Sequence, residues 1–81
     1  MFDFQDLYKA YATDVYRFSY WLCGDAVDAE DITSETFLRA WTYRASIRTE
    51  TMKAYLLSIA RNVFGALAQA QAAYRTHRWD A

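Results

Sequence analysis

The 81-residue chain contains no proline and only two glycines, and this shortage of helix-breaking residues limits the folds open to it. Proline and glycine interrupt local structure most strongly, so long helices are favoured and an all-β fold with many turns is not. Apolar residues recur every three or four positions, which is the spacing of one helical face. The sequence therefore predicts an all-α fold, a small three-helix bundle in which the helices hide their apolar faces against one another.

The apolar spacing predicts helices over about residues 4–23, 26–43 and 51–74. Gly24 is expected to end the first helix in a left-handed conformation. Asp25 is expected to cap the second, with Asp28 three residues later in a carboxylate variant of the capping box. The apolar stripes are Phe4, Leu7, Tyr11, Val15, Phe18 and Leu22 in the first helix, Ala29, Ile32, Thr36, Phe37, Ala40 and Trp41 in the second, and Met52, Leu56, Ile59, Val63, Leu67 and Ala70 in the third.

The segment TYRASIRTET, residues 42–51, has no helical periodicity, and we interpret it as a loop. Thr49 or Thr51 is expected to cap the helix that follows. Gly65 lies inside that helix, where it costs roughly 1 kcal/mol relative to alanine, so we expect a bend or a close approach there. We interpret residues 1–81 as a single domain, with 75–81 as a tail or linker.

Composition excludes several classes of function. Cys23 is the only cysteine and His77 the only histidine, so the chain has no internal disulfide and no zinc site of the usual spacing. No nucleophile–base pair or phosphate-binding glycine loop is present, and we expect neither an enzyme nor a bound cofactor or metal. The longest apolar runs, YWLC and AYLL, are too short to span a bilayer. The acidic N-terminus does not resemble a signal peptide, so we expect a cytoplasmic protein without a membrane partner.

The charges divide unevenly along the chain, although the net charge is −1. Residues 1–36 hold eight of the ten acids, and residues 37–81 hold seven of the nine bases. Such a division indicates two surfaces with different partners. The alternative is that both are ordinary solvated faces.

The second predicted helix carries three acids on one face, because Asp28, Asp31 and Glu35 are spaced by three and four residues. Like charges at this spacing destabilise an isolated helix by roughly 0.2–0.5 kcal/mol per pair. The helix dipole accounts for Asp28 in the first turn but not for Glu35 two turns later. Either Glu35 pairs with Arg39, or the stripe faces a basic surface on another protein.

Three separated motifs resemble region 2 of bacterial sigma factors, most closely the extracytoplasmic-function (ECF) group. They are LYKAYATDVYRFSYWLCGDAVDAED, the overlapping DAEDITSETFLRAW, and YLLSIARNV, and they occur in the family's order over about residues 5–65. The resemblance implies a helical domain that takes part in transcription initiation without catalysing a reaction. A full sigma factor also has a second helical domain, region 4, to which residues 75–81 would lead.

The resemblance implies that the second helix binds the basic clamp helices of the RNA polymerase β′ subunit. Asp31 and Glu35 match the acidic contact positions of the family, while Ser34 stands where glutamine is usual. The polymerase-binding residues expected on this basis are Asp28, Asp31, Ser34, Glu35, Leu38 and Arg39. An anti-sigma factor is a further partner that the resemblance suggests.

The resemblance also implies contact with promoter DNA at the minus-ten element. The loop would capture a base flipped out of the single strand, and Arg61 and Asn62 would meet the upstream duplex. Cations that follow phosphates and aromatic faces that stack on bases suit this task. The DNA-binding residues expected are Tyr43, Arg44, Ala45, Ser46, Ile47, Arg48, Lys53, Tyr55, Ser58, Arg61 and Asn62. An ordinary polar loop is the alternative for the residues before the third helix.

The third predicted helix departs from the family pattern. Ser58 stands where arginine or lysine is usual, and Gln69 and Ala70 stand where a basic run begins. Each lost phosphate contact weakens DNA binding. An alternative function is therefore a sigma-like interaction domain that binds polymerase or an anti-sigma factor without recognising a promoter.

Overall fold

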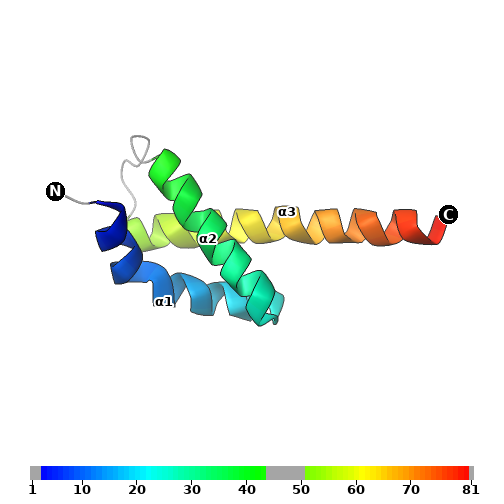
Figure 1. The fold of residues 1–81 in the computed structure, drawn as a ribbon, viewed down its shortest axis with the longest axis horizontal. Helices are drawn as coiled ribbons and strands as arrows, with labels where there is room; N and C mark the ends of the chain where they lie inside the picture. The colour runs from blue at the N-terminus through cyan, green and yellow to red at the C-terminus, as the bar shows by residue number, and fades with distance from the viewer. Residues whose placement is uncertain (1–2, 44–50, 81) are drawn as a thin grey trace.

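The computed structural model describes residues 3–43 and 51–80, and the side chains of residues 3–43 and 51–73. Within these ranges the chain forms three helices, α1 (Phe4–Cys23), α2 (Ala26–Thr42) and α3 (Met52–Asp80), each of which contacts the other two. Figure 1 shows α1 and α2 packed beside the first part of α3, while the later part of α3 extends past them. The predicted all-α three-helix fold is confirmed.

Aspartates cap the starts of α1 and α2, and the α1–α2 connection at Gly24 and Asp25 forms as the sequence predicts. Asp3 Oδ1 accepts a hydrogen bond from the Asp6 amide at 2.9 Å and caps α1. Gly24 ends α1 with φ of 70°, in the left-handed region that glycine adopts without a steric penalty. Asp25 Oδ1 accepts from the Asp28 amide at 3.0 Å, which confirms Asp25 as the cap of α2. Local sequence signals therefore fix this corner of the bundle.

α3 begins as predicted but continues further. Thr51 Oγ1 accepts a hydrogen bond from the Ala54 amide at 3.2 Å, which confirms Thr51 as a cap, while Thr49 lies outside the described residues. The helix runs to Asp80, beyond the end expected at residue 74. Ala70, expected in the apolar stripe, is exposed, because α3 here extends past the other helices. Alanine and glutamine favour a helix without needing burial, which explains the continuation.

The core lies where the stripes of the three helices meet. Phe37, Ile32, Leu56 and Val15 are the largest apolar side chains with almost no exposed surface. Phe37 also contacts α1 through its ring, since its centroid lies 4.9 Å from that of Tyr8. The predicted stripes account for most of the core, but fully buried Ala60 was not among them, and Phe4, which was, is 38% exposed.

Three hydroxyl groups are buried beside this core, those of Ser19, Thr33 and Thr36. Each donates a 2.7 Å hydrogen bond to the carbonyl four residues earlier in its own helix. Because a buried hydroxyl without a partner is costly, these local bonds allow small polar residues to remain in the core. Among the described residues, no buried side-chain nitrogen or oxygen lacks a partner.

Replacing Gly65 with alanine is expected to raise the free energy of unfolding by about 1 kcal/mol, because glycine is a poor helix former. No described atom outside the local helix backbone lies within 4 Å of the position that a Cβ would take, so the close approach expected there is not observed. Chemical denaturation would measure the gain. The same substitution at Gly24 should lower stability by roughly 1–2 kcal/mol, because its φ of 70° disfavours a side chain. A loss of stability in Gly65→Ala would contradict the open environment of this glycine.

Candidate functional site

The solvent-facing side of α2 carries a continuous row of exposed residues. Val27, Asp31, Ser34 and Leu38 are spaced by four, three and four residues, so they share one face of the helix. We call these four residues the outer ridge of α2. Val27 and Leu38 at its two ends are 67% and 59% exposed. The opposite side of the helix is the buried stripe, so the same periodicity that builds the core presents this ridge to solvent.

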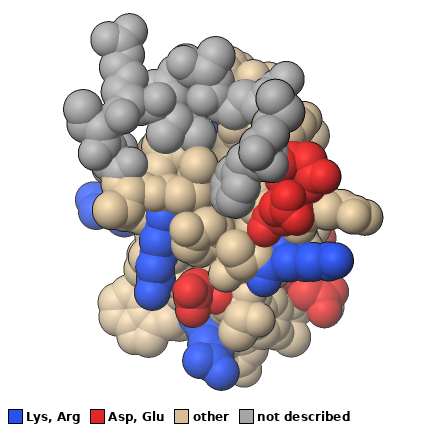
Figure 2. All heavy atoms as spheres, turned by 90° about the vertical axis from the view of Figure 1, so that its left-hand side faces the viewer, with Lys and Arg blue, Asp and Glu red and all other residues tan. Residues whose placement is uncertain are grey.

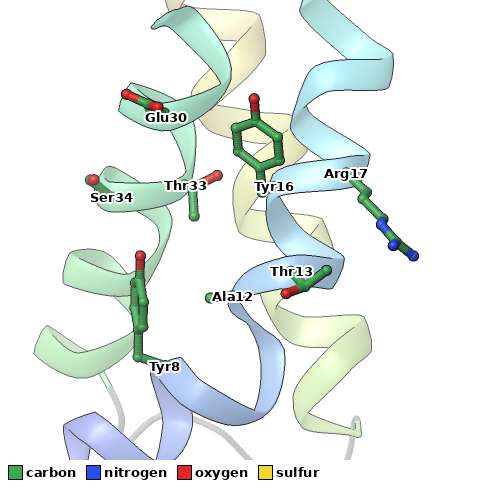
Figure 3. A pocket seen from close by; sticks show the side chains of 8 residues that line it. All are labelled: Tyr8, Ala12, Thr13, Tyr16, Arg17, Glu30, Thr33 and Ser34. Carbon is green, nitrogen blue, oxygen red and sulfur yellow. The ribbon is translucent and has the colours of Figure 1, made fainter. Parts of the chain in front are cut away.

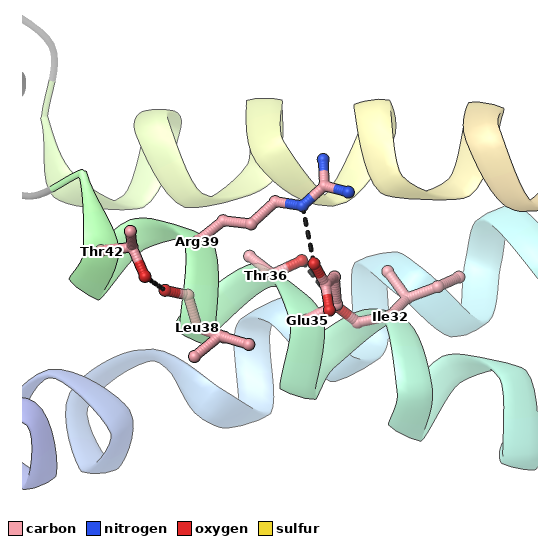
Figure 4. Close-up of polar contacts among 6 residues, drawn as sticks. All are labelled: Ile32, Glu35, Thr36, Leu38, Arg39 and Thr42. Carbon is pink, nitrogen blue, oxygen red and sulfur yellow. Dashed lines mark hydrogen bonds and ion pairs between the residues drawn. The ribbon is translucent and has the colours of Figure 1, made fainter.

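Two of the three acids in the predicted stripe on α2 differ in their surroundings. Arg39 Nε donates to Glu35 Oε2 at 2.8 Å, and the two side chains are 44% and 42% exposed. Figure 4 shows Arg39 reaching back to Glu35, while Leu38 points away from the pair. The alternative expected for Glu35, pairing within its own helix, is therefore observed. Of these three stripe acids, Asp31 is the one that is both exposed and without an ion pair to any residue that the structure describes, so it is free to meet a partner.

The exposed Glu35–Arg39 pair contributes little to stability. An ion pair of this kind within a helix is worth about 0.3–0.5 kcal/mol, because solvent screens both charges. The pair nevertheless neutralises the middle of the flank beside the outer ridge. Asp28, Glu30 and Asp31 therefore carry the uncompensated negative charge near the N-terminal half of α2.

A hollow of about 350 Å³ lies at the C-terminal end of α2. Its lining includes Leu38 from the outer ridge, Thr42, and Tyr43, which follows the helix. The Tyr43 side chain is 60% exposed, while its backbone amide bonds the Arg39 carbonyl at 2.9 Å. Glu35 and Arg39 also line the hollow, so the structure brings three residues predicted to bind polymerase beside one predicted to bind DNA.

The other predicted DNA-binding residues before and at the start of α3 differ in their surroundings. Arg44, Ala45, Ser46, Ile47 and Arg48 lie outside the described residues. Lys53 Nζ lies 3.7 Å from Asp14 Oδ2 of α1, an exposed ion pair that the sequence did not indicate. Tyr55 is half-buried and packs against the core, so only part of its ring faces solvent. A separation of 39 positions between Asp14 and Lys53 explains why sequence periodicity missed their contact.

The outward face of α3 carries Ser58, Arg61 and Asn62, all exposed. Among the described side chains of α3, Lys53 and Arg61 are the only cations. Figure 2 shows the end of the molecule near the start of α3, where blue and red side chains alternate. The described part of this face therefore offers isolated cations for phosphate, not a continuous basic patch.

A groove of about 580 Å³ separates α1 from α2. Tyr8 and Tyr16 border it from α1, and Glu30, Thr33 and Ser34 from α2. Figure 3 shows Arg17, at the edge of the groove, pointing away from α2. The sequence did not indicate this groove, because it depends on how the two helices cross.

Two further observations concern the described residues alone. They contain no group of three or more His, Cys, Asp or Glu side chains close enough to hold a metal ion. None of their helices combines the length and the hydropathy that a bilayer-crossing segment needs.

Comparison with known proteins identifies a family and several relatives. Residues 7–78 match the model of the family described as Sigma-70 region 2. The chain is 39% identical over 59 residues to the ECF RNA polymerase sigma factor SigM of Bacillus subtilis, covering 73% of this chain and 36% of SigM. It is 42% identical over 66 residues to the ECF RNA polymerase sigma factor BldN of Streptomyces coelicolor, covering 74% of this chain and 24% of BldN.

A third relative, the ECF RNA polymerase sigma factor SigL of Mycobacterium tuberculosis, is 39% identical over 59 residues, which cover 70% of this chain and 33% of SigL. The alignments with these three relatives thus span between 24% and 36% of their lengths. No solved structure matches the chain significantly.

Proposed function

Because the chain belongs to the Sigma-70 region 2 family, we propose that it acts as a sigma region 2 in bacterial transcription initiation. In this proposal the outer ridge of α2 docks on the basic clamp helices of the RNA polymerase β′ subunit. The segment after α2 and the outward face of α3 then recognise the minus-ten promoter element and help to melt it. The observation that carries the proposal is Asp31, exposed at the middle of the outer ridge and without an ion-pair partner among the described residues.

The charge arrangement on α2 supports docking on a basic helix. Complementary charges steer two proteins together and fix their orientation, so an unpaired acid on an exposed ridge favours a basic partner. Asp28 and Glu35 border the ridge, although Glu35 must exchange its bond with Arg39 before it can meet a new cation. Ser34 offers a shorter polar group than the usual glutamine of the family, so the contact there is smaller.

Three exposed residues support contact with promoter DNA. Tyr43 presents an aromatic ring at the end of α2, and such a ring stacks on an unpaired base. Arg61 and Asn62 on α3 suit a phosphate and a base edge respectively. Flipping a base out of a duplex costs a few kcal/mol, which stacking and the loop must recover. No cofactor takes part, and the proposed role places the chain in the cytoplasm.

The alternative function, an interaction domain without promoter recognition, also has an observation in its favour. Lys53 and Arg61 are the only cations among the described side chains of α3, and Lys53 lies beside Asp14. With so few free cations, affinity for isolated DNA should be low. Such a domain would bind polymerase or an anti-sigma factor through α2 without capturing a strand of the promoter.

A strand-capture experiment separates the two functions. Binding to a β′ clamp-helix fragment is measured first, and then capture of a single-stranded minus-ten oligonucleotide with core polymerase present. Tyr43→Ala is expected to weaken strand capture about tenfold, because one stacked base is lost, while clamp affinity stays unchanged. Tyr20→Ala, which removes a 46% exposed ring from α1, is the matched control and should change neither. Clamp binding without any strand capture by the unmodified chain would favour the alternative.

A further inference from the structure

Val27 and Leu38 are two exposed aliphatic side chains that point in nearly the same direction from α2. They lie 11 residues apart, which corresponds to about 16 Å along the axis and to just over three helical turns. Asp31 and Ser34 lie between them on the outer ridge. The ridge is therefore apolar at both ends and polar or negatively charged in the middle.

Neither aliphatic side chain serves the fold. Val27 and Leu38 do not belong to the core or to the partly buried residues packed against it. Leu38 points away from the Glu35–Arg39 pair (Figure 4). A single exposed aliphatic residue is ordinary on a protein surface. Val27 and Leu38, however, point in nearly the same direction and flank the unpaired Asp31. Together they form a surface that an amphipathic helix would cover.

We propose that Val27 and Leu38 are apolar anchors that set the register of the basic helix docking on α2. The inference rests on the proposed function, in which the β′ clamp supplies that helix. Because two α-helices rise equally per residue, a partner helix lying nearly along α2 needs apolar residues about 11 positions apart. A lysine or arginine between them then meets Asp31. The charge of Asp31 attracts the partner helix. Val27 and Leu38 then select the one register of that helix in which both of them are buried.

The test compares Val27→Ser and Leu38→Ser with Asp31→Arg for binding to a β′ clamp-helix fragment at low and high salt. Each serine variant is expected to lose affinity about tenfold, because burial of one aliphatic side chain is forfeited. That loss should be the same at both salt concentrations. The loss in Asp31→Arg should shrink at high salt, because salt screens exposed charges. Circular dichroism verifies that each variant keeps its helices.

Trp21→Ser is the matched control for removing an exposed apolar side chain. Trp21 is 77% exposed and lies two helical turns after Asp14, on the flank of α1 that faces α3 through Lys53. Its replacement should leave clamp affinity unchanged. Equal weakening by Trp21→Ser would overturn the assignment of the anchors to α2. Weakening by Asp31→Arg alone would overturn the anchors and leave the proposed function standing. No binding by the unmodified chain would overturn both.

Discussion

Replacing Phe37 with alanine is expected to lower the free energy of unfolding by about 3–5 kcal/mol, the range for truncating a buried phenylalanine. Phe37 is 1% exposed at the centre of the core, and its ring contacts those of Phe4 and Tyr8 on α1. The substitution would leave a cavity between α1 and α2. The surrounding side chains belong to two different helices, so they cannot easily collapse into it. Because a domain this small lies near the low end of the usual stability range, about 5 kcal/mol, the variant should keep little net stability and be partly unfolded at 25 °C.

The neighbouring residue provides the control for this substitution. Leu38 is 59% exposed on the same helix, and Leu38→Ala should change the free energy of unfolding by no more than about 0.5 kcal/mol. Urea denaturation followed by circular dichroism measures both. Similar effects of the two substitutions would contradict the orientation of α2 described above.

Reversing the charge of Asp31 is expected to have the largest effect on binding. Asp31→Arg should reduce affinity for the β′ clamp-helix fragment about a hundredfold at low salt, because a lost attraction is replaced by repulsion between like charges. The fold should be unaffected, since Asp31 is exposed and pairs with no described residue. Titration calorimetry or fluorescence anisotropy against the fragment would measure the change.

Glu30→Arg makes the same change of charge one residue earlier. Glu30 is exposed, but it lines the groove between α1 and α2, whereas Asp31 lies on the side of the outer ridge away from that groove. We therefore expect at most a few-fold loss, arising from the change in overall charge. If both variants lost affinity equally, net charge and not the geometry of the ridge would govern binding.

The sequence predicted the elements whose signals are local. The bounds of α1, the left-handed Gly24 and the cap at Asp25 each depend on residues within one helical turn, and all are confirmed. The apolar spacing likewise predicted burial of Phe37 and Leu56. The family resemblance is confirmed by the match over residues 7–78.

Periodicity did not predict which residues of different helices meet. It also did not predict where α3 extends past the other two helices. Periodicity placed Ala70 on a buried face, but no other helix reaches it. It left open whether Glu35 pairs with Arg39, which the structure resolves in favour of the pair. It did not reveal that Asp14 approaches Lys53. The roles of the polymerase-binding and DNA-binding residues remain predictions.

The buried hydroxyls of Ser19, Thr33 and Thr36 have a consequence for how the bundle moves. Each bonds back to its own helix, so none of these three ties one helix to another. Small sliding or rotation of α2 against α1 therefore breaks none of these three bonds, although it would shift the ring contacts that Phe4 and Tyr8 make with Phe37. These buried hydroxyls therefore stabilise the individual helices, while apolar and aromatic packing holds α2 against α1.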